Sequence, residues 1–329
     1  MWGRERAPTP PDAALHTTGV AKDTLAMRTN RFVPYLFLLP AVAILVLGLM
    51  VPLYNAVMLS FYDWGFGQPW SARRYLGFAN FERLVTDPGV WRSVRTTFVF
   101  GFWVVTIEML IGVGLALLLE KAVRGATFIR TIFVMPLMIA PVVVGLIWRY
   151  LLDARTGIIN YYLTQIGEAI PFLQALGFRA QTWLADPTLA MVSIVVSDVW
   201  QWTPFVFMIV LAGLQGLPGD VIEASYIDGA NWWRMTWHIK LPMLRNILLI
   251  ALLMRIIDVF RALEVIFVMT GGGPGSSTRV LSLSLFQTAF TSQDLGYAAT
   301  IALLLSLILI ILSVILMVFN NPLRERSDV

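Results

Sequence analysis

Long apolar segments dominate this chain and restrict it to folds that a lipid bilayer accepts. An α-helix rises about 1.5 Å per residue, so about 20 apolar residues in a row cross the hydrocarbon layer. Because that layer holds no water, the backbone of each segment must bond to itself, as a helix does. The sequence therefore predicts an all-α membrane protein with six transmembrane helices, at Val33–Met58, Thr97–Leu119, Phe128–Leu151, Thr188–Leu214, Leu244–Met269 and Gly296–Phe319.

Composition agrees with this class and excludes several others. Hydrophobic residues make up 58% of the 329 residues and charged residues 13%, against about 25% charged in soluble domains. The net charge is +4 and no basic run alternates with aromatic residues, so no nucleic-acid partner is predicted. The chain has no cysteine, and His16 and His238 are not spaced as metal ligands, so neither a metal site nor catalytic residues are expected.

The polar segments predict how the chain is oriented. Residues 1–30 are polar and rich in proline at their start, which favours a flexible tail. Six crossings place both termini on one side, and Lys121, Arg124 and Arg130 lie in a short segment on that side. Because Lys and Arg are enriched in cytoplasmic loops, both termini are predicted to be cytoplasmic.

A polar segment at 214–242 separates the fourth apolar run from the fifth and is too charged to cross a bilayer. Pro218 suits the first turn of a helix, and Gly229 suits a break between two helices. Asp228 is expected to cap the second helix and Pro242 to end it. We therefore expect two short amphipathic helices in an L-shaped bend on the membrane face. Five apolar side chains would face the bundle or the headgroups: Ile222, Tyr226, Trp232, Trp233 and Trp237.

The same segment resembles the cytoplasmic loop of permeases in binding-protein-dependent ABC importers. The matching positions are Glu223, Ala224, Ser225, Asp228, Gly229, Ala230, Ile239, Leu241 and Pro242, with Ser225 in place of the family's second alanine. The resemblance implies a type I ABC importer permease fold. It also implies that this loop is the coupling helix, which sits in a groove of an ATPase subunit. All of these positions except Ala230 and Leu241 are implied to couple the chain to the ATPase.

The resemblance continues along most of the chain. The third span of sugar permeases and the loop after it are similar to Pro141–Asn160, and their fourth span is similar to Val199-Trp200 with Thr203–Phe205. The outer loop of the first of two permeases in carbohydrate importers is similar to Thr270–Pro274, Thr278, Ala289-Phe290 and Leu295–Ala299. Those importers are of the maltose, lactose and glycerol-3-phosphate type. The resemblance implies import of a sugar or sugar derivative by alternating access in a bacterial inner membrane. The implied partners are membrane lipid, a second homologous permease, two ATPase subunits, and a periplasmic or lipid-anchored solute-binding protein.

The resemblance also implies what this chain leaves to its partners and how it is divided. It would be non-catalytic and hold no cofactor, because the partner ATPase binds ATP and Mg²⁺. Residues 1–30 would form a flexible cytoplasmic tail, and 31–92 the first transmembrane helix and a periplasmic loop. Residues 93–322 would form the permease core, including the coupling loop at 214–242, and 323–329 a second cytoplasmic tail.

Ionisable residues inside the predicted spans are costly in a bilayer and are expected to face protein or water. Glu108 and Asp198 lie in the second and fourth spans, and Arg255, Asp258, Arg261 and Glu264 lie in the fifth. One interpretation is structural, with i,i+3 pairs along the fifth span and bridges to Asp198 or Glu108. The other is a substrate path lined by Asp198, Trp200, Gln201, Trp202, Arg255 and Asp258, in which only one of the two tryptophans serves the site. The sequence leaves both interpretations open.

Two other function classes make different demands on the sequence. An ion-coupled secondary carrier for a small polar solute would use the buried carboxylates as relays, and it would transport without an ATPase. A membrane-embedded hydrolase would need a nucleophile, base or metal set that the sequence lacks. The glycine-rich Thr270–Ser277 does not end in Gly-Lys-Ser/Thr, so it is not expected to be a phosphate loop. It is either a tight outer turn next to a docked partner or an ordinary loop, and the sequence leaves both open.

Overall fold

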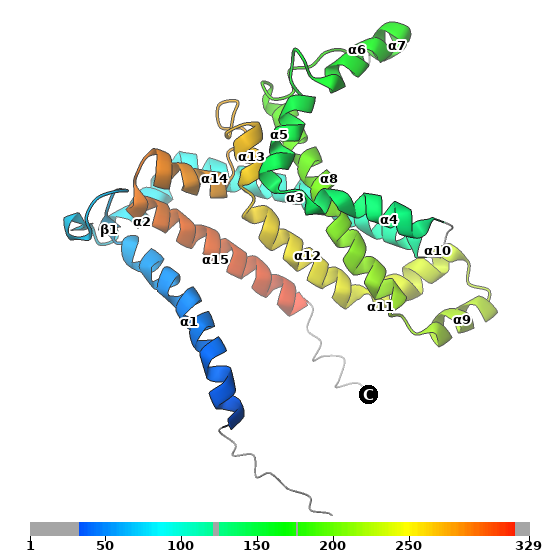
Figure 1. Ribbon diagram of the computed structural model, residues 1–329, viewed down its shortest axis with the longest axis horizontal. Coiled ribbons are helices and arrows are strands. Elements are labelled where there is room, and N and C mark those ends of the chain that lie inside the picture. The colour runs from blue at the N-terminus through cyan, green and yellow to red at the C-terminus, as the bar shows by residue number, and fades with distance from the viewer. Residues whose placement is uncertain (1–32, 121–124, 176, 320–329) are drawn as a thin grey trace, which may run out of the picture. The chain divides into compact units, whose positions relative to one another are not determined.

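The computed structural model describes residues 33–120, 125–175 and 177–319 (Figure 1). The predicted tails, and the basic residues Lys121 and Arg124, lie outside the described residues. The chain divides into two compact units, one ending at Pro52 and the other beginning at Leu53.

The first unit contains most of α1 (Val33–Leu59), an apolar helix of 27 residues. Pro40 and Pro52 lie inside this helix. Proline is tolerated inside transmembrane helices more readily than in soluble ones. The helix matches the predicted first span at Val33–Met58.

A short irregular segment opens the second unit after α1. Strand β1 (Tyr62–Asp63) pairs antiparallel with β2 (Arg74–Tyr75), and the 3₁₀ turn η1 (Trp70–Ala72) lies between them in sequence. Helix α2 (Ala79–Thr86) follows and leads directly to the next long helix.

Two long helices, α3 (Pro88–Leu119) and α8 (Pro187–Gln215), pack along each other in the second unit. Each begins with an aspartate that accepts backbone N–H bonds, followed by a proline at the first helical position. Small residues bring the two helices close, because a Cβ on Gly112 would lie only 2.7 Å from the side chain of Val206. More than half of the most apolar stretch of α8 is buried, so α8 lies at the centre of this unit.

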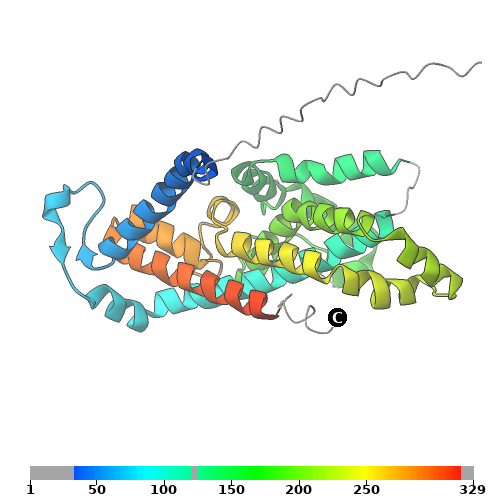
Figure 2. The same ribbon diagram turned by 90° about the horizontal axis from the view of Figure 1, so that it is seen from below.

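Helices α12 (Arg245–Phe260) and α15 (Leu295–Phe319) lie side by side in both views (Figures 1 and 2). Phe260 and Ile301 belong to one buried apolar cluster that joins them. Helix α14 (Leu281–Phe286) and the π turn η4 (Gln287–Thr291) precede α15 in the chain.

The predicted third span, Phe128–Leu151, is not one straight helix. It consists of α4 (Ala126–Val134), the 3₁₀ turn η2 (Met135–Met138) and α5 (Pro141–Leu151), and its two parts are bent by 98°. Proline causes the break, because Pro136 and Pro141 lack the N–H that an α-helix needs. The residue before Pro141 is accordingly extended, with ψ of 136°.

The predicted fifth span, Leu244–Met269, is also interrupted. Helix α12 ends at Phe260, and α13 (Glu264–Met269) starts after three non-helical residues. The carbonyl of Ala262, freed by this break, accepts a hydrogen bond from the Ser282 hydroxyl. Among the described residues, four helices are long and apolar enough to cross a membrane, or five if the bent pair counts as one span. The predicted count of six is therefore not confirmed.

Candidate functional site

The polar segment between α8 and α12 folds into two helical arms. The first arm is α9 (Gly219–Ile227), and the second is the continuous run α10 (Trp232–Met235), π turn η3 (Thr236–Lys240) and α11 (Leu241–Met243). The two arms meet at a bend, as predicted (Figure 1). We call this segment, 214–242, the coupling loop below.

The bend depends on Gly229. Its φ of +75° lies in the left-handed region, where a side chain is strained. The Gly229 N–H donates to the carbonyl of Tyr226 at 3.1 Å, and the Ala230 N–H donates to the carbonyl of Ser225 at 3.0 Å. This pair of bonds is the Schellman arrangement that ends a helix at a glycine. The predicted break at Gly229 is confirmed.

Two predicted ends of the second arm are wrong. Asn231 caps it, accepting the Arg234 N–H at 2.9 Å, and Asp228 instead ends the first arm. Both residue types cap helices well, but the two bonds at Gly229 carry the chain past Asp228 before the second arm begins. Pro242 does not end this arm, which continues to Met243. The helix widens into the π turn just before Pro242, since proline cannot donate to the turn behind it.

The exposed side of the loop combines acidic and apolar groups. Glu223, Ala224, Asp228, Gly229 and Pro242 are exposed, Ile239 is half-buried, and Ser225 is buried. Within the part of the chain that the structure describes, the Glu223 carboxylate has no hydrogen-bond or ion-pair partner. The buried Ser225 hydroxyl donates to the carbonyl of Val221 at 2.6 Å, so the serine is accommodated where the family has alanine.

Large apolar side chains on the loop are also exposed. Ile227 is 86% exposed, and Tyr226, Trp232, Trp233 and Trp237 are exposed as well. Ile222 is half-buried. Contiguous exposed apolar groups of this size mark a protein or membrane contact. Of the five, Ile222 is partly covered by the bundle, and the prediction that the other four face headgroups stays a prediction.

A second group of predicted residues meets at a buried arginine. Arg255 of α12 donates from Nε to Glu108 Oε2 at 2.6 Å and from Nη2 to Glu108 Oε1 at 2.8 Å. Nη2 also donates to Asp198 Oδ1 at 2.9 Å. No side chain of these three is more than 5% exposed. One cation thus joins α3, α8 and α12 in a region that excludes water.

Asp258 extends this group toward the surface. Its Oδ2 lies 3.9 Å from Arg255 Nη1, and its Oδ1 accepts from Arg261 Nη2 at 3.0 Å. These are two of the predicted i,i+3 pairs. Arg261 and Glu264 do not pair within the described chain, because the helix breaks between them.

The remaining predicted path residues lie on α8. The Arg255 guanidinium lies 4.9 Å from the centre of the half-buried Trp202 ring, whereas Trp200 is 40% exposed and contacts Trp148 edge-on at 6.0 Å. The two tryptophans therefore point apart, as predicted. Gln201 is buried and donates to the carbonyl of Ile139 at 2.9 Å. The geometry brings together Asp198, Trp202, Arg255 and Asp258, and their part in a substrate path stays a prediction.

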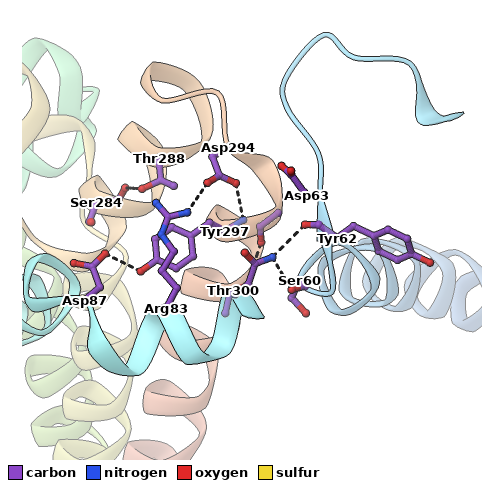
Figure 3. Close-up of polar contacts among 12 residues, drawn as sticks. Ser60, Tyr62, Asp63, Arg83, Asp87, Ser284, Thr288, Asp294, Tyr297 and Thr300 are labelled. Atoms are coloured by element: carbon purple, nitrogen blue, oxygen red, sulfur yellow. Dashed lines mark hydrogen bonds and ion pairs between the residues drawn. The ribbon is translucent and has the colours of Figure 1, made fainter. Parts of the chain in front are cut away.

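The Leu295–Ala299 segment anchors the start of α15. A Cβ on Gly296 would lie 1.9 Å from the carbonyl oxygen of Tyr62, so only glycine fits there. The Tyr297 hydroxyl donates to Asp87 at 2.8 Å, while Arg83 lies over the Tyr297 ring and pairs with Asp294 at 2.8 Å (Figure 3). The sequence does not predict these contacts, because Arg83 and Asp87 lie 211 and 210 positions from their partners Asp294 and Tyr297.

The electrostatics of Asp87 follow from these contacts. Burial alone raises the pKa of a carboxyl group. The bonds from the Tyr297 hydroxyl and from the N–H groups of Gly89 and Val90, together with Arg83, outweigh burial and hold the pKa of Asp87 below its ordinary value. Asp87 therefore stays ionised while it caps α3.

The glycine-rich segment Thr270–Ser277 forms a compact turn. Gly271, Gly272 and Gly275 have φ of 60°, 93° and 61°. The hydroxyls of Thr270 and Thr278 lie 2.8 Å apart, and Thr278 also donates to the carbonyl of Gly273 at 2.8 Å.

Comparison with known proteins gives one consistent result. Residues 108–326 match the family described as "binding-protein-dependent transport system inner membrane component". A probable ABC transporter permease protein of Sinorhizobium fredii, y4oQ, is 34% identical over 266 residues, covering 81% of this chain and 82% of that protein. The trehalose/maltose transport system permease protein MalF of Thermococcus litoralis is 31% identical over 270 residues, covering 82% and 87%.

A solved structure has the same fold. It is a bacterial alginate ABC transporter in complex with an alginate pentasaccharide-bound periplasmic protein. One of its chains superposes with a TM-score of 0.76 at 18% identity, covering 89% of this chain and 95% of that chain. The family match covers more than half of the sequence and includes the last part of α3 together with α8, the coupling loop and α12. The chain therefore belongs to the family of inner membrane components of binding-protein-dependent transport systems, as a permease subunit of an ABC importer and not an enzyme.

Proposed function

We propose that this chain forms one half of a pathway that carries a sugar or sugar derivative across the membrane by alternating access. A second homologous permease forms the other half, and two ATPase subunits bind ATP and Mg²⁺. A periplasmic or lipid-anchored binding protein delivers the substrate. Both termini and the coupling loop lie on the cytoplasmic side.

The observation that carries this proposal is the surface of the first arm. Glu223 has no partner within the described chain, and Tyr226 and Ile227 are exposed beside it. A carboxylate accepting charge-assisted hydrogen bonds, surrounded by apolar contacts, supports docking to a protein groove. Closure of the ATPases on ATP would move this arm, and the movement would pass through the Gly229 bend to the second arm and α12.

The substrate class rests on the relatives and on residue chemistry. MalF is named for trehalose and maltose, and the solved transporter carries alginate. Sugars present hydroxyls and a weakly apolar face, which favour charged or amide groups near an aromatic ring. Asp198, Arg255 and Asp258 beside the Trp202 ring supply these groups in this chain.

The test is substrate-stimulated ATP hydrolysis by the reconstituted importer. Glu223→Ala and Gly229→Asp are expected to reduce the stimulation while the subunits still co-purify. Glu168→Ala is a matched control, because Glu168 is an exposed glutamate on α6 (Ile158–Ala169), away from the loop. Full stimulation in both loop variants would contradict the coupling role. Uptake by this chain without an ATPase would instead indicate a secondary carrier.

A further inference from the structure

A second ion pair, partly buried, lies where the coupling loop meets α3. Lys240, the last residue of η3, donates from Nζ to Oε1 of Glu120, the residue directly after α3. The Lys240 side chain is 5% exposed and the Glu120 side chain 12% exposed. No other partner of Lys240 is found in the described chain. Within the described residues, the Lys240 ammonium therefore depends on this one contact.

Two sets of charges connect α3 to the second arm and α12. One is the Lys240–Glu120 pair, and the other is the cluster of Arg255 with Glu108 and Asp198. Glu108 and Glu120 both belong to the α3 segment, 12 residues apart, which is about 18 Å along a helix. Their partners, Arg255 and Lys240, lie in and just before α12 in the opposite order. The second arm and α12 are thus held against α3 at both ends of an antiparallel pair of segments.

The two arms of the coupling loop differ in how firmly they are held. Ser225 is the only buried residue of α9, whereas the second arm buries Met235, Thr236 and Lys240. A cavity of about 260 Å³ separates them, lined by Glu120 and Lys240 on one side and by side chains of α9 on the other. The first arm is therefore presented to a partner, while the second is fixed to the bundle.

We propose that the Lys240–Glu120 ion pair is the positioning contact through which movement of the coupling loop reaches α3. The pair makes the second arm, α12 and α3 move as one block when the first arm is displaced. This inference rests on the proposed function, and Lys240 and Glu120 act by positioning α3 without touching substrate. An ion pair suits this role, because buried charges hold their partners in one geometry and removal of one leaves the other unpaired.

The experiment measures a distance inside the complete importer. The chain has no cysteine, so spin labels can be placed at Leu118→Cys on α3 and Met243→Cys on the second arm once any partner cysteines are replaced. Both positions are exposed. When the Lys240–Glu120 ion pair is intact, we expect the same narrow distribution of distances between the two labels without nucleotide and after trapping with ATP and vanadate. In Lys240→Met we expect the distribution to broaden or shift on trapping.

Charge exchange separates positioning from general damage. Lys240→Met and Glu120→Gln are expected to lower ATP hydrolysis stimulated by the binding protein about tenfold, a change of about 1.4 kcal/mol, with unassisted hydrolysis unchanged. Lys240→Arg is expected to keep most of the stimulation, and the exchange Lys240→Glu with Glu120→Lys to restore most of it. Arg74→Met, which breaks an exposed ion pair with Asp63, is the matched control and is expected to change neither readout.

The outcomes are distinguishable from failure of the proposed function. If the chain does not assemble with an ATPase, the proposed function fails. If the importer assembles and Glu223→Ala uncouples it, but the two labels move apart on trapping while the Lys240–Glu120 ion pair is intact, the ion-pair proposal alone is overturned. Unchanged distances and stimulation in Lys240→Met would overturn it equally.

Discussion

Removal of the buried Arg255 charge is the most severe single change that the structure predicts for the membrane bundle. Arg255→Met keeps much of the side-chain length and removes three charge-assisted bonds, of 2.6, 2.8 and 2.9 Å. Glu108 and Asp198 are then left at 0% and 5% side-chain exposure with no cation between them. Breaking a buried ion pair by removing one partner costs about 3–5 kcal/mol.

The expected loss is large compared with the roughly 5–15 kcal/mol that holds a typical domain together. At about 2–4 °C per kcal/mol, the variant should unfold roughly 10 °C below the unaltered protein. Thermal unfolding of the purified importer in detergent, followed by tryptophan fluorescence, measures this shift. Arg261→Met is the matched control, since its ion pair with Asp258 is 62% exposed on the arginine side and is worth about 1 kcal/mol at most.

A compensated variant tests the cause. Arg255→Met combined with Glu108→Gln and Asp198→Asn removes all three charges and keeps the side-chain shapes. Replacing a complete buried ion cluster by hydrophobic residues of similar volume is often close to neutral for stability, and the neutral amides used here likewise leave no unpaired buried charge. The triple variant should therefore unfold at a higher temperature than Arg255→Met alone. A triple variant less stable than the single one, or a single variant as stable as Arg261→Met, would refute the electrostatic argument.

Two further predictions concern the start of α15. Gly296→Ala should lower the unfolding temperature by several degrees, because its Cβ would lie 1.9 Å from the Tyr62 carbonyl oxygen. Gly114→Ala is the control, since its Cβ would meet nothing within 4 Å. Equal unfolding temperatures of the two variants would contradict the close approach at Gly296. The pKa of Asp87 is lowered in the folded state, so the ionised carboxylate stabilises the fold. This stabilisation is fully present above the unfolded-state pKa of Asp87 and is lost as the pH falls through its folded-state pKa. Asp87→Asn should therefore flatten the acid side of a stability–pH profile, and an unchanged slope would show that other groups set it.

The apolar runs predicted helices well where no residue opposes them. Helices α1, α3, α8 and α15 each cover a predicted span. Pro136 and Pro141 indicate the bend between α4 and α5 in the sequence, but a prediction based only on the length of the apolar run does not include it. The break after Phe260 contains neither proline nor glycine, and it follows from tertiary contacts such as the bond from Ser282.

The site residues also differ in whether the local sequence predicts their contacts. Gly229 was predictable because a left-handed turn needs glycine, and the fixed spacing of a helix predicted the pairing of Arg255 and Asp258. Contacts between distant segments carried no local signal. Lys240 and Glu120 are 120 positions apart, and Tyr297 and Asp87 are 210 apart. No periodicity in one sequence relates such positions.

The most direct test of the account is to find what the first arm of the coupling loop touches in the cell. A photo-crosslinking amino acid at Ile227, 86% exposed on α9, should join this chain to an ATPase subunit. The same substitution at Phe172, 71% exposed on α7 (Pro171–Ala175), is the matched control and should give no such product. Products from Ile227 that contain only lipid or this chain itself would contradict the claim that an ATPase drives the bundle through this arm.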